Sequence, residues 1–289
     1  MDEPIYHYPA EYDLEHAHPE ADLKYYQAIV RRWRPRQVLE LGCGTGRVTI
    51  PLAQLSTAGM ERIVGLERVP EMLRAARAKA ARQNKSVRQR LQWLLGDLRT
   101  YRAAGQFDLI IAPCGTLCHL LSLRDQSAAW QAAFANLAPG GRFVADVPLP
   151  EFSVLAESTQ IPRRTILQLD NDTAQSGPGG GKRLLRYKTV SYYAAEQRAR
   201  VRYLYDEFWP GRRSRRFFSD YQHHVFFPRE LELLFRAAGF AIESLAGDYS
   251  EAPLANHSRV LLMVGRKPRT GKKSGPGTGR RPRFQPQNH

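Results

Sequence analysis

The residues with the clearest chemistry form an acidic, glycine-rich segment, ELGCGTG, at positions 40–46. It follows an apolar run and precedes a helical pattern. Glycines at alternate positions allow a tight turn and let the backbone approach a ligand closely. A dinucleotide-binding fingerprint would place its third glycine one position later, where this chain has Arg47. The segment therefore predicts a small-ligand site where a strand ends and a helix begins, with Glu40 beside it.

Two more acids follow later apolar runs. Glu67 ends the run IVGLE, and Asp97 follows a third run in LGDL. A carboxylate in the first position can accept hydrogen bonds from ribose hydroxyls, as it also does in NAD enzymes. Asp97 is suited to accept from an adenine amino group. Each acid alone could be structural, Glu67 as a helix N-terminal charge and Asp97 as a turn residue, but all three in register favour a nucleoside site.

The elements that must position these acids alternate between strand and helix. Continuous apolar strands separated by helical patterns predict a parallel sheet covered on both faces. The expected strands are 38–41, 63–66, 91–95, 107–112 and 142–147, and closing strands follow at 241–246 and 259–264.

After Pro150 the pattern changes to segments rich in Tyr, Phe, Val, Thr and Arg, with few helix signals. They predict an antiparallel insertion of about four strands. The segments lie near 163–170, 183–194, 198–209 and 216–227, with GPGGG at 177–181 as a flexible connection. A helix then begins at Pro228 and ends before Gly239, which favours a helix C-terminus.

Over about residues 8–267 the chain resembles class I S-adenosylmethionine-dependent methyltransferases. The matching segments are VLELGCGTG (38–46), IVGLERVPEML (63–73), LLGDL (94–98), FDLIIAP (107–113) and LAPGGRFVADV (137–147). The resemblance implies an α/β fold with a doubly wound, Rossmann-like sheet of seven strands, the last antiparallel. It places the antiparallel insertion after strand five and makes S-adenosyl-L-methionine the cofactor.

The resemblance also implies roles for individual residues. Glu40 would orient the cofactor ammonium, Glu67 would hold the ribose, and Asp97 with the Leu98 amide would hold adenine. The family's usual acid after the second strand is Asp, so Glu67 is a departure. The residues expected to bind the cofactor are Glu40, Gly42, Gly44, Gly46, Glu67, Met72, Asp97, Leu98 and Pro113.

More narrowly, the chain resembles small-molecule methyltransferases of the nucleotide-aminosugar N-methyltransferase type. The segments EYDL (11–14) and GTLCHL (115–120), and the insertion with its His- and Phe-rich end, carry this likeness. It makes Tyr12 and His119 the candidate catalytic residues, either of which could serve as a base, although His119 could equally be structural. The candidate substrate-pocket residues are Tyr221, His223 and Tyr249.

Other chemistries are less favoured. His223 and His224 face opposite ways in an alternating strand, so we expect no metal site there. Pro113-Cys114 resembles the nucleophile segment of cytosine C5 methyltransferases, but their Glu-Asn-Val segment is absent. The sequence APCG at 112–115 also lacks the motif of amino-purine methyltransferases. A scaffold that binds the nucleotide without turnover is supported by none of the motifs.

The net charge of +15 is concentrated in two segments. Residues 163–216 and 266–289 each carry a surplus of eight positive charges, which leaves the rest of the chain nearly neutral. Arginines in the insertion suggest an acidic or phosphorylated acceptor, although a solvated strand face explains them as well. The basic tail leaves open an alternative, methylation of RNA or protein. The expected reaction is methyl transfer to N or O of a small molecule.

Composition limits the setting. Three cysteines without paired spacing indicate reduced thiols and a cytoplasmic protein. No apolar stretch reaches the roughly 20 residues that span a bilayer, the N-terminus does not look secretory, and a homodimer is one option for assembly. The expected domains are a cap or lid (1–30), a cofactor-binding core (31–149), the insertion as an acceptor lid (150–227), a return to the core (228–267) and a disordered basic tail (268–289).

Overall fold

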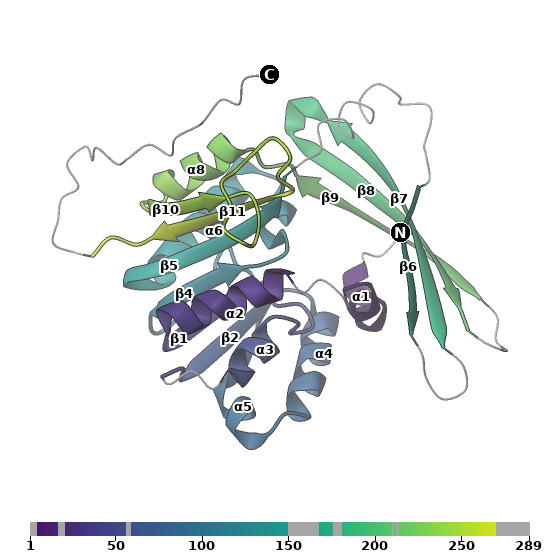
Figure 1. Cartoon of the computed structure of the whole chain (residues 1–289), viewed down its shortest axis with the longest axis horizontal. Helices are drawn as coiled ribbons and strands as arrows, with labels where there is room; N and C mark the ends of the chain where they lie inside the picture. Colours follow the sequence, from purple (N-terminus) through teal and green to yellow (C-terminus); the bar gives the residue numbers. More distant parts are fainter. Residues whose placement is uncertain are drawn as a thin grey trace.

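A computed structural model describes residues 5–16, 21–55, 59–149, 168–175, 181–209, 211 and 214–269. It contains a seven-stranded sheet in the order β10-β11-β5-β4-β1-β2-β3 and a four-stranded sheet in the order β6-β7-β8-β9 (Figure 1). Strands β1 to β5 pair in parallel, and β11 is antiparallel to both β5 and β10. The predicted fold class is confirmed, including the single antiparallel strand at the end and the antiparallel insertion.

The large sheet is built from the short apolar runs that the sequence shows. Its strands are β1 (Gln37–Leu41), β2 (Arg62–Glu67), β3 (Leu91–Leu95), β4 (Phe107–Ala112), β5 (Leu137–Pro148), β10 (Ala241–Ala246) and β11 (Val260–Arg266). The helices in the described parts of the core are α2 (Ala21–Trp33), α3 (Thr49–Gln54), α4 (Pro70–Ala81), α5 (Lys85–Arg90), α6 (Leu123–Asn136) and α8 (Pro228–Ala237), with a 3-10 turn η2 (Thr116–His119).

Apolar layers on both faces hold this sheet. Trp130 of α6 is fully buried in one layer, and Tyr26 of α2 is fully buried in the other. Along β1 the side chains alternate, so Val38 enters the α2 layer and Leu39 enters the α6 layer. The same alternation directs Glu40 toward α3, where the Thr49 hydroxyl donates to its carboxylate.

The inserted sheet consists of β6 (Gln168–Gln175), β7 (Lys182–Tyr193), β8 (Arg198–Phe208) and β9 (Arg215–His224), all antiparallel. Part of the first expected segment (163–167) and positions 176–180, with most of the glycine-rich connection, lie outside the described residues. So does nearly all of the basic tail, residues 270–289. On β8, Tyr203 and Tyr205 are buried while Arg200 and Arg202 are exposed, so the sheet has one apolar and one solvated face.

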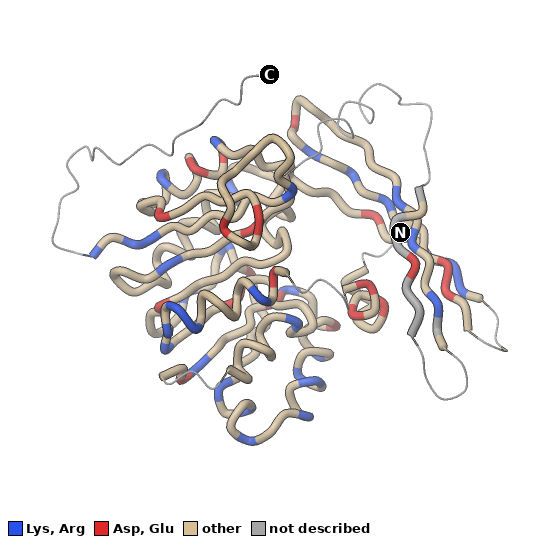
Figure 2. The backbone as a smooth tube through the Cα atoms, in the orientation of Figure 1, with Lys and Arg blue, Asp and Glu red and all other residues tan. Residues whose placement is uncertain are grey.

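The N-terminal segment packs between the two sheets. A 3-10 turn, η1 (Ile5–His7), and helix α1 (Pro9–Glu15) lie against the buried face of the inserted sheet (Figure 1). Ile5 and Leu14 are buried there with Tyr203 and Tyr205. Figure 2 shows acidic residues grouped on α1 and both charge signs interspersed along the inserted strands.

Most arginines of the inserted sheet that the structure describes pair with acids on its outer face. Arg200 and Arg202 both donate to Asp220. Two further pairs are Arg216 with Asp206 and Arg183 with Asp172. Exposed pairs of this kind contribute little to stability. Much of the positive surplus therefore belongs to a solvated strand face.

Candidate functional site

A cleft of about 1150 Å³ opens where β1 to β4 end. It is lined by ten of the residues singled out in the sequence: Tyr12, Glu40, Gly42, Gly44, Glu67, Met72, Asp97, Leu98, Pro113 and His119. Gly46 does not line it. An added Cβ at Gly46 would meet the Trp93 ring at 2.8 Å, so this glycine lets the loop pack closely on β3.

The glycine loop has the left-handed backbone that its sequence predicts. Gly42 has φ +68° and Gly44 has φ +55°. An added Cβ at Gly42 would lie 2.5 Å from the Thr116 side chain, which allows the loop to contact the turn after β4. The Gly44 amide points at the end of β2 and donates to the Glu67 carboxylate at 2.9 Å.

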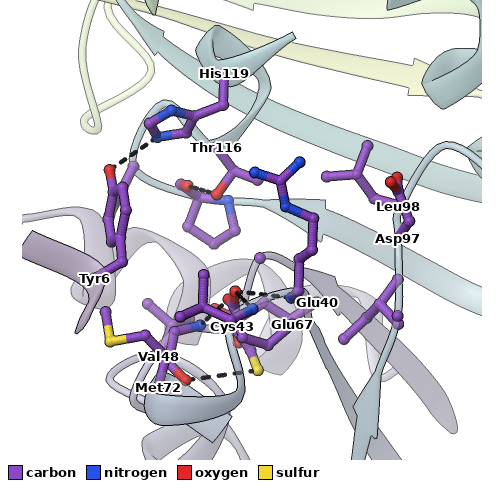
Figure 3. Close-up of a pocket in the computed structure, with 18 of the residues that line it drawn as sticks. Tyr6, Glu40, Cys43, Val48, Glu67, Met72, Asp97, Leu98, Thr116 and His119 are labelled. Atoms are coloured by element: carbon purple, nitrogen blue, oxygen red, sulfur yellow. Dashed lines mark hydrogen bonds between the residues drawn. The ribbon is translucent and has the colours of Figure 1, made fainter. Parts of the chain in front are cut away.

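Glu67 is held by backbone amides at the end of β2. Its carboxylate also accepts from the amides of Arg68 and Val69, each at 2.8 Å. In the close-up these bonds lie at the floor of the cleft (Figure 3). The carboxylate is therefore fixed in place where a bound hydroxyl could donate to it.

Glu40 is buried at the end of β1, with only 2% of its surface exposed. Burial raises the pKa of its carboxyl to about 8, and the nearby Glu67 adds to the rise. A cationic group arriving in the cleft would favour the charged carboxylate. Glu40 is thus suited to bind an ammonium.

Asp97 lies at the other end of the cleft, beside Leu98 and opposite Tyr6 and Met72 (Figure 3). Its carboxylate accepts from the Arg99 guanidinium at 2.5 to 3.0 Å, and this pairing lowers the pKa of Asp97. Arg99 also donates to Asp125 at 2.8 Å. Asp97 therefore stays ionised, in a pairing that the sequence analysis did not foresee.

A second cavity, of about 590 Å³, lies between the core and the inserted sheet. Tyr221 and His223 line it, together with residues that the sequence analysis missed: Tyr6, His16, Arg186 and Tyr203. The Tyr-rich N-terminus was the available signal for Tyr6. This cavity and the cleft share the four residues Tyr6, Tyr12, Cys114 and His119. A group passing from one cavity to the other would cross this boundary.

Three of the four boundary residues, Tyr6, Tyr12 and His119, are aromatic. Tyr6 Oη lies 2.9 Å from His119 Nε2. Burial lowers the pKa of His119 to about 4 and that of His223 to about 3, whereas it raises the pKa of Tyr6. At neutral pH both groups are therefore uncharged, and the tautomer of His119 sets whether the Tyr6 hydroxyl donates to Nε2 or accepts from Nε2–H.

His224 and Tyr249 lie outside the two cavities. His224 is buried on the opposite face of β9 from His223, and its Nε2 lies 2.7 Å from Glu230. Tyr249, expected in the substrate pocket, lines neither cavity. Its hydroxyl donates at 3.0 Å to buried Asp146, because the turn before β11 packs against α2 rather than over the cleft.

The thiols are poorly suited to act as nucleophiles. Cys114 is an exposed residue, but desolvation of its thiol, which contacts Arg47 and Asp22, raises the pKa of that thiol. A protonated thiol is a weak nucleophile. Cys43 and Cys118 are buried. Among the described residues, no group of three or more His, Cys, Asp or Glu could hold a metal ion.

Comparison with known proteins shows a likeness to methyltransferases. Residues 38–141 match a family model described as "Methyltransferase domain". This match covers about a third of the chain, and the fold of the whole chain is similar to that of a solved S-adenosylmethionine-dependent methyltransferase from Clostridium acetobutylicum. No helix in the described ranges is both long and apolar enough to cross a bilayer.

Individual proteins show the same likeness. The putative methyltransferase YqeM of Bacillus subtilis is 24% identical over 235 residues, covering 81% of this chain and 85% of YqeM. The sugar N-methyltransferase KedS8 from Streptoalloteichus superposes with a TM-score of 0.65 at 19% identity, covering 89% of this chain and 92% of KedS8. CalS10, an amino pentose methyltransferase from Micromonospora echinaspora solved with S-adenosylmethionine, gives 0.62 at 22% identity, covering 90% and 96%.

Proposed function

We propose that this protein transfers a methyl group from S-adenosylmethionine to the nitrogen of a small-molecule amine. The observation that carries the proposal is the junction of the two cavities at Tyr6, Tyr12, Cys114 and His119. One cavity offers acids and backbone amides, and the other offers aromatic rings. This arrangement supports a donor and an acceptor that meet at the boundary.

The residues of the cleft fit the cofactor. Glu40 would bind the ammonium, Glu67 the ribose hydroxyls, and Asp97 with the Leu98 amide the adenine edge. Met72 is buried at the cleft wall, where its thioether can pack on an aromatic ring. When bound, S-adenosylmethionine supplies a methyl group on a positively charged sulfur. The protein's own contribution is mainly alignment of the acceptor with that methyl group, which can lower a barrier by several kcal/mol.

The second cavity suits an amine in its uncharged form. Its walls include four tyrosine rings and three imidazoles, those of His16, His119 and His223, whose pKa values are all lowered by burial. Removal of water from an amine lowers its pKa, so an enclosed amine keeps the lone pair that attacks the methyl group. Such an acceptor needs no strong base before attack. The Tyr6–His119 pair would then position the nitrogen and accept or donate hydrogen bonds.

Two observations narrow the acceptor class. KedS8 and CalS10 act on sugars, and the hydroxyl and imidazole groups of this cavity could bond to sugar hydroxyls. A phosphorylated acceptor has less support. Four arginines of the insertion pair with acids on the outer face, and Arg186, which lines the cavity, pairs with Glu15. We therefore favour an amino sugar or a similar polyhydroxylated amine.

A methyl-transfer screen tests this proposal. Full-length protein is incubated with S-adenosylmethionine and matched pairs of sugars that differ only in an amino or a hydroxyl group at one carbon. Formation of S-adenosylhomocysteine with the amino member alone is the expected result. Turnover only with hydroxyl compounds, or only with RNA or protein, would overturn the amine assignment. If calorimetry detects no binding of S-adenosylhomocysteine, the assignment of the protein as a methyltransferase is overturned.

A further inference from the structure

Arg47 follows the glycine loop directly, and its guanidinium lines the cleft. The guanidinium donates to both carboxylate oxygens of Asp22, at 3.1 Å for Nη1 to Oδ1, and Nη2 lies 2.6 Å from Cys114 Sγ. The side chain of Asp22 is 4% exposed and that of Arg47 is 17% exposed. A charged pair is thus almost enclosed beside the ligand site.

Asp22 is itself held rigidly. It lies in the first turn of α2, and its Oδ1 accepts from the Leu23 amide at 2.7 Å. The Cys114 thiol lies 3.0 Å from its Oδ2. Burying an ion pair costs desolvation energy that its mutual attraction barely repays, so stability alone explains this pair poorly. A guanidinium with a fixed plane is, however, well suited to bind a planar anion.

Three arginines line the cleft: Arg47, Arg68 and Arg99. Arg47 acts electrostatically on Glu40 and Tyr12. Arg68 acts on Asp97 and His119, and Arg99 pairs with Asp97 and Asp125, so both lie toward the Asp97 end. An α-amino acid carries its ammonium and carboxylate on one carbon, so the groups that bind them must be neighbours. With Glu40 as the ammonium site, Arg47 is the cationic neighbour.

We infer that Arg47 binds the carboxylate of the cofactor's amino-acid end, and that Asp22 is the positioning residue that fixes its guanidinium. Arg47 and Glu40 together then form a site for a zwitterion. This inference rests on the proposed function, because it takes S-adenosylmethionine as the ligand of the cleft. It extends that function by assigning a residue to the cofactor carboxylate, which Glu40, Glu67 and Asp97 do not bind.

Titration calorimetry with two ligands tests it. S-adenosylmethionine and its decarboxylated analogue differ only in the carboxylate. For the unaltered protein we expect the carboxylate to increase affinity about 10- to 100-fold, as for a hydrogen bond to a charged group. Arg47→Met should abolish that preference while leaving the affinity for the decarboxylated ligand within about threefold. Asp22→Asn should reduce the preference only partly, because the guanidinium remains but loses its fixed orientation.

Arg68→Met is the matched control, since it removes a guanidinium from the other end of the cleft. This variant should still bind S-adenosylmethionine more tightly than the decarboxylated analogue, even if its affinity for both ligands falls by the same factor. Binding of the decarboxylated ligand also shows that each variant is folded. An unchanged preference in Arg47→Met would overturn the inference. Failure of the unaltered protein to bind either ligand would instead overturn the proposed function.

Discussion

The two cavities that meet at His119 are constructed differently. The cleft is formed by strand ends and backbone amides, and Glu40, Glu67 and Asp97 lie at or just after the ends of neighbouring strands β1, β2 and β3. The second cavity is formed by rings from distant segments, such as Tyr6 and Tyr221, which are 215 positions apart in the numbering. A site made by the backbone is set by local sequence, whereas a site made by side chains depends on how separate segments pack.

Helix α1 contacts both the core that carries the cleft and the inserted sheet that lines the second cavity. On the core side, Asp13 accepts from the Thr45 hydroxyl at 2.5 Å and from Lys79 at 2.6 Å. On the inserted side, Glu15 pairs with Arg186 and accepts from the Tyr205 hydroxyl. Changes in the cleft should therefore affect cofactor binding first, and changes at Glu15 should affect the acceptor first.

The largest effect that we expect is on the cleft. In Gly44→Arg, the new side chain points toward Tyr12 and Met72, which lie within 4 Å of an added Cβ. It fills the space for the cofactor, so affinity for S-adenosylhomocysteine should fall by about 100-fold or more. Calorimetry measures the loss. Gly59→Arg is the control, because Gly59 also has positive φ but has open space around it; an equal loss there would implicate backbone strain instead.

A somewhat smaller effect concerns proton binding by Glu40. Burial raises the pKa of Glu40 from 4.5 to about 8, so between these values the native chain holds a proton that the unfolded chain has lost. The contribution of Glu40 to the free energy of unfolding should therefore fall as the pH rises, by about 2 kcal/mol between pH 6 and 8.5. His119 and His223, whose pKa values are lowered, contribute with the opposite sign over this range, so the quantity to compare is the difference between the unaltered protein and Glu40→Gln. Urea unfolding of both proteins at both pH values measures that difference, and a difference that does not change with pH would assign the titration to another group.

The smallest effect separates the acceptor side from the cofactor side. Glu15→Gln leaves Arg186 in the second cavity without the charge that neutralises it. We expect kcat/KM for the acceptor to fall about tenfold, with S-adenosylhomocysteine affinity changed by less than about threefold. Asp220→Asn, which breaks exposed pairs with Arg200 and Arg202, is the control and should change neither. Equal losses of both quantities in Glu15→Gln would show that the two cavities are not separable.

The parts that sequence predicted well follow from the geometry of parallel strands. The carboxyl ends of such strands share one edge of the sheet, so Glu40, Glu67 and Asp97 could be placed together. Alternation along β9 likewise separated His223 from His224. In both cases the placement of the residues could be predicted from the strand pattern of the local sequence alone.

The remaining features depend on long-range packing that no local period encodes. The pairing of Asp97 with Arg99 is a choice of side-chain rotamer. Tyr6 reaches His119 only because η1 packs on the inserted sheet, and Tyr249 lies behind the cleft because its turn packs on α2. Gly46 was grouped with the ligand-binding glycines by spacing alone, although its closest neighbour is Trp93.

Helix α1 has one more consequence, because its Tyr12 forms part of the wall of both cavities. Any molecule that binds more tightly when this helix is docked stabilises the docked arrangement for the other ligand as well. Thermodynamic reciprocity then requires that the donor strengthens acceptor binding by the same factor as the acceptor strengthens donor binding. A helix of seven residues is thus the element through which coupling between donor and acceptor binding would run.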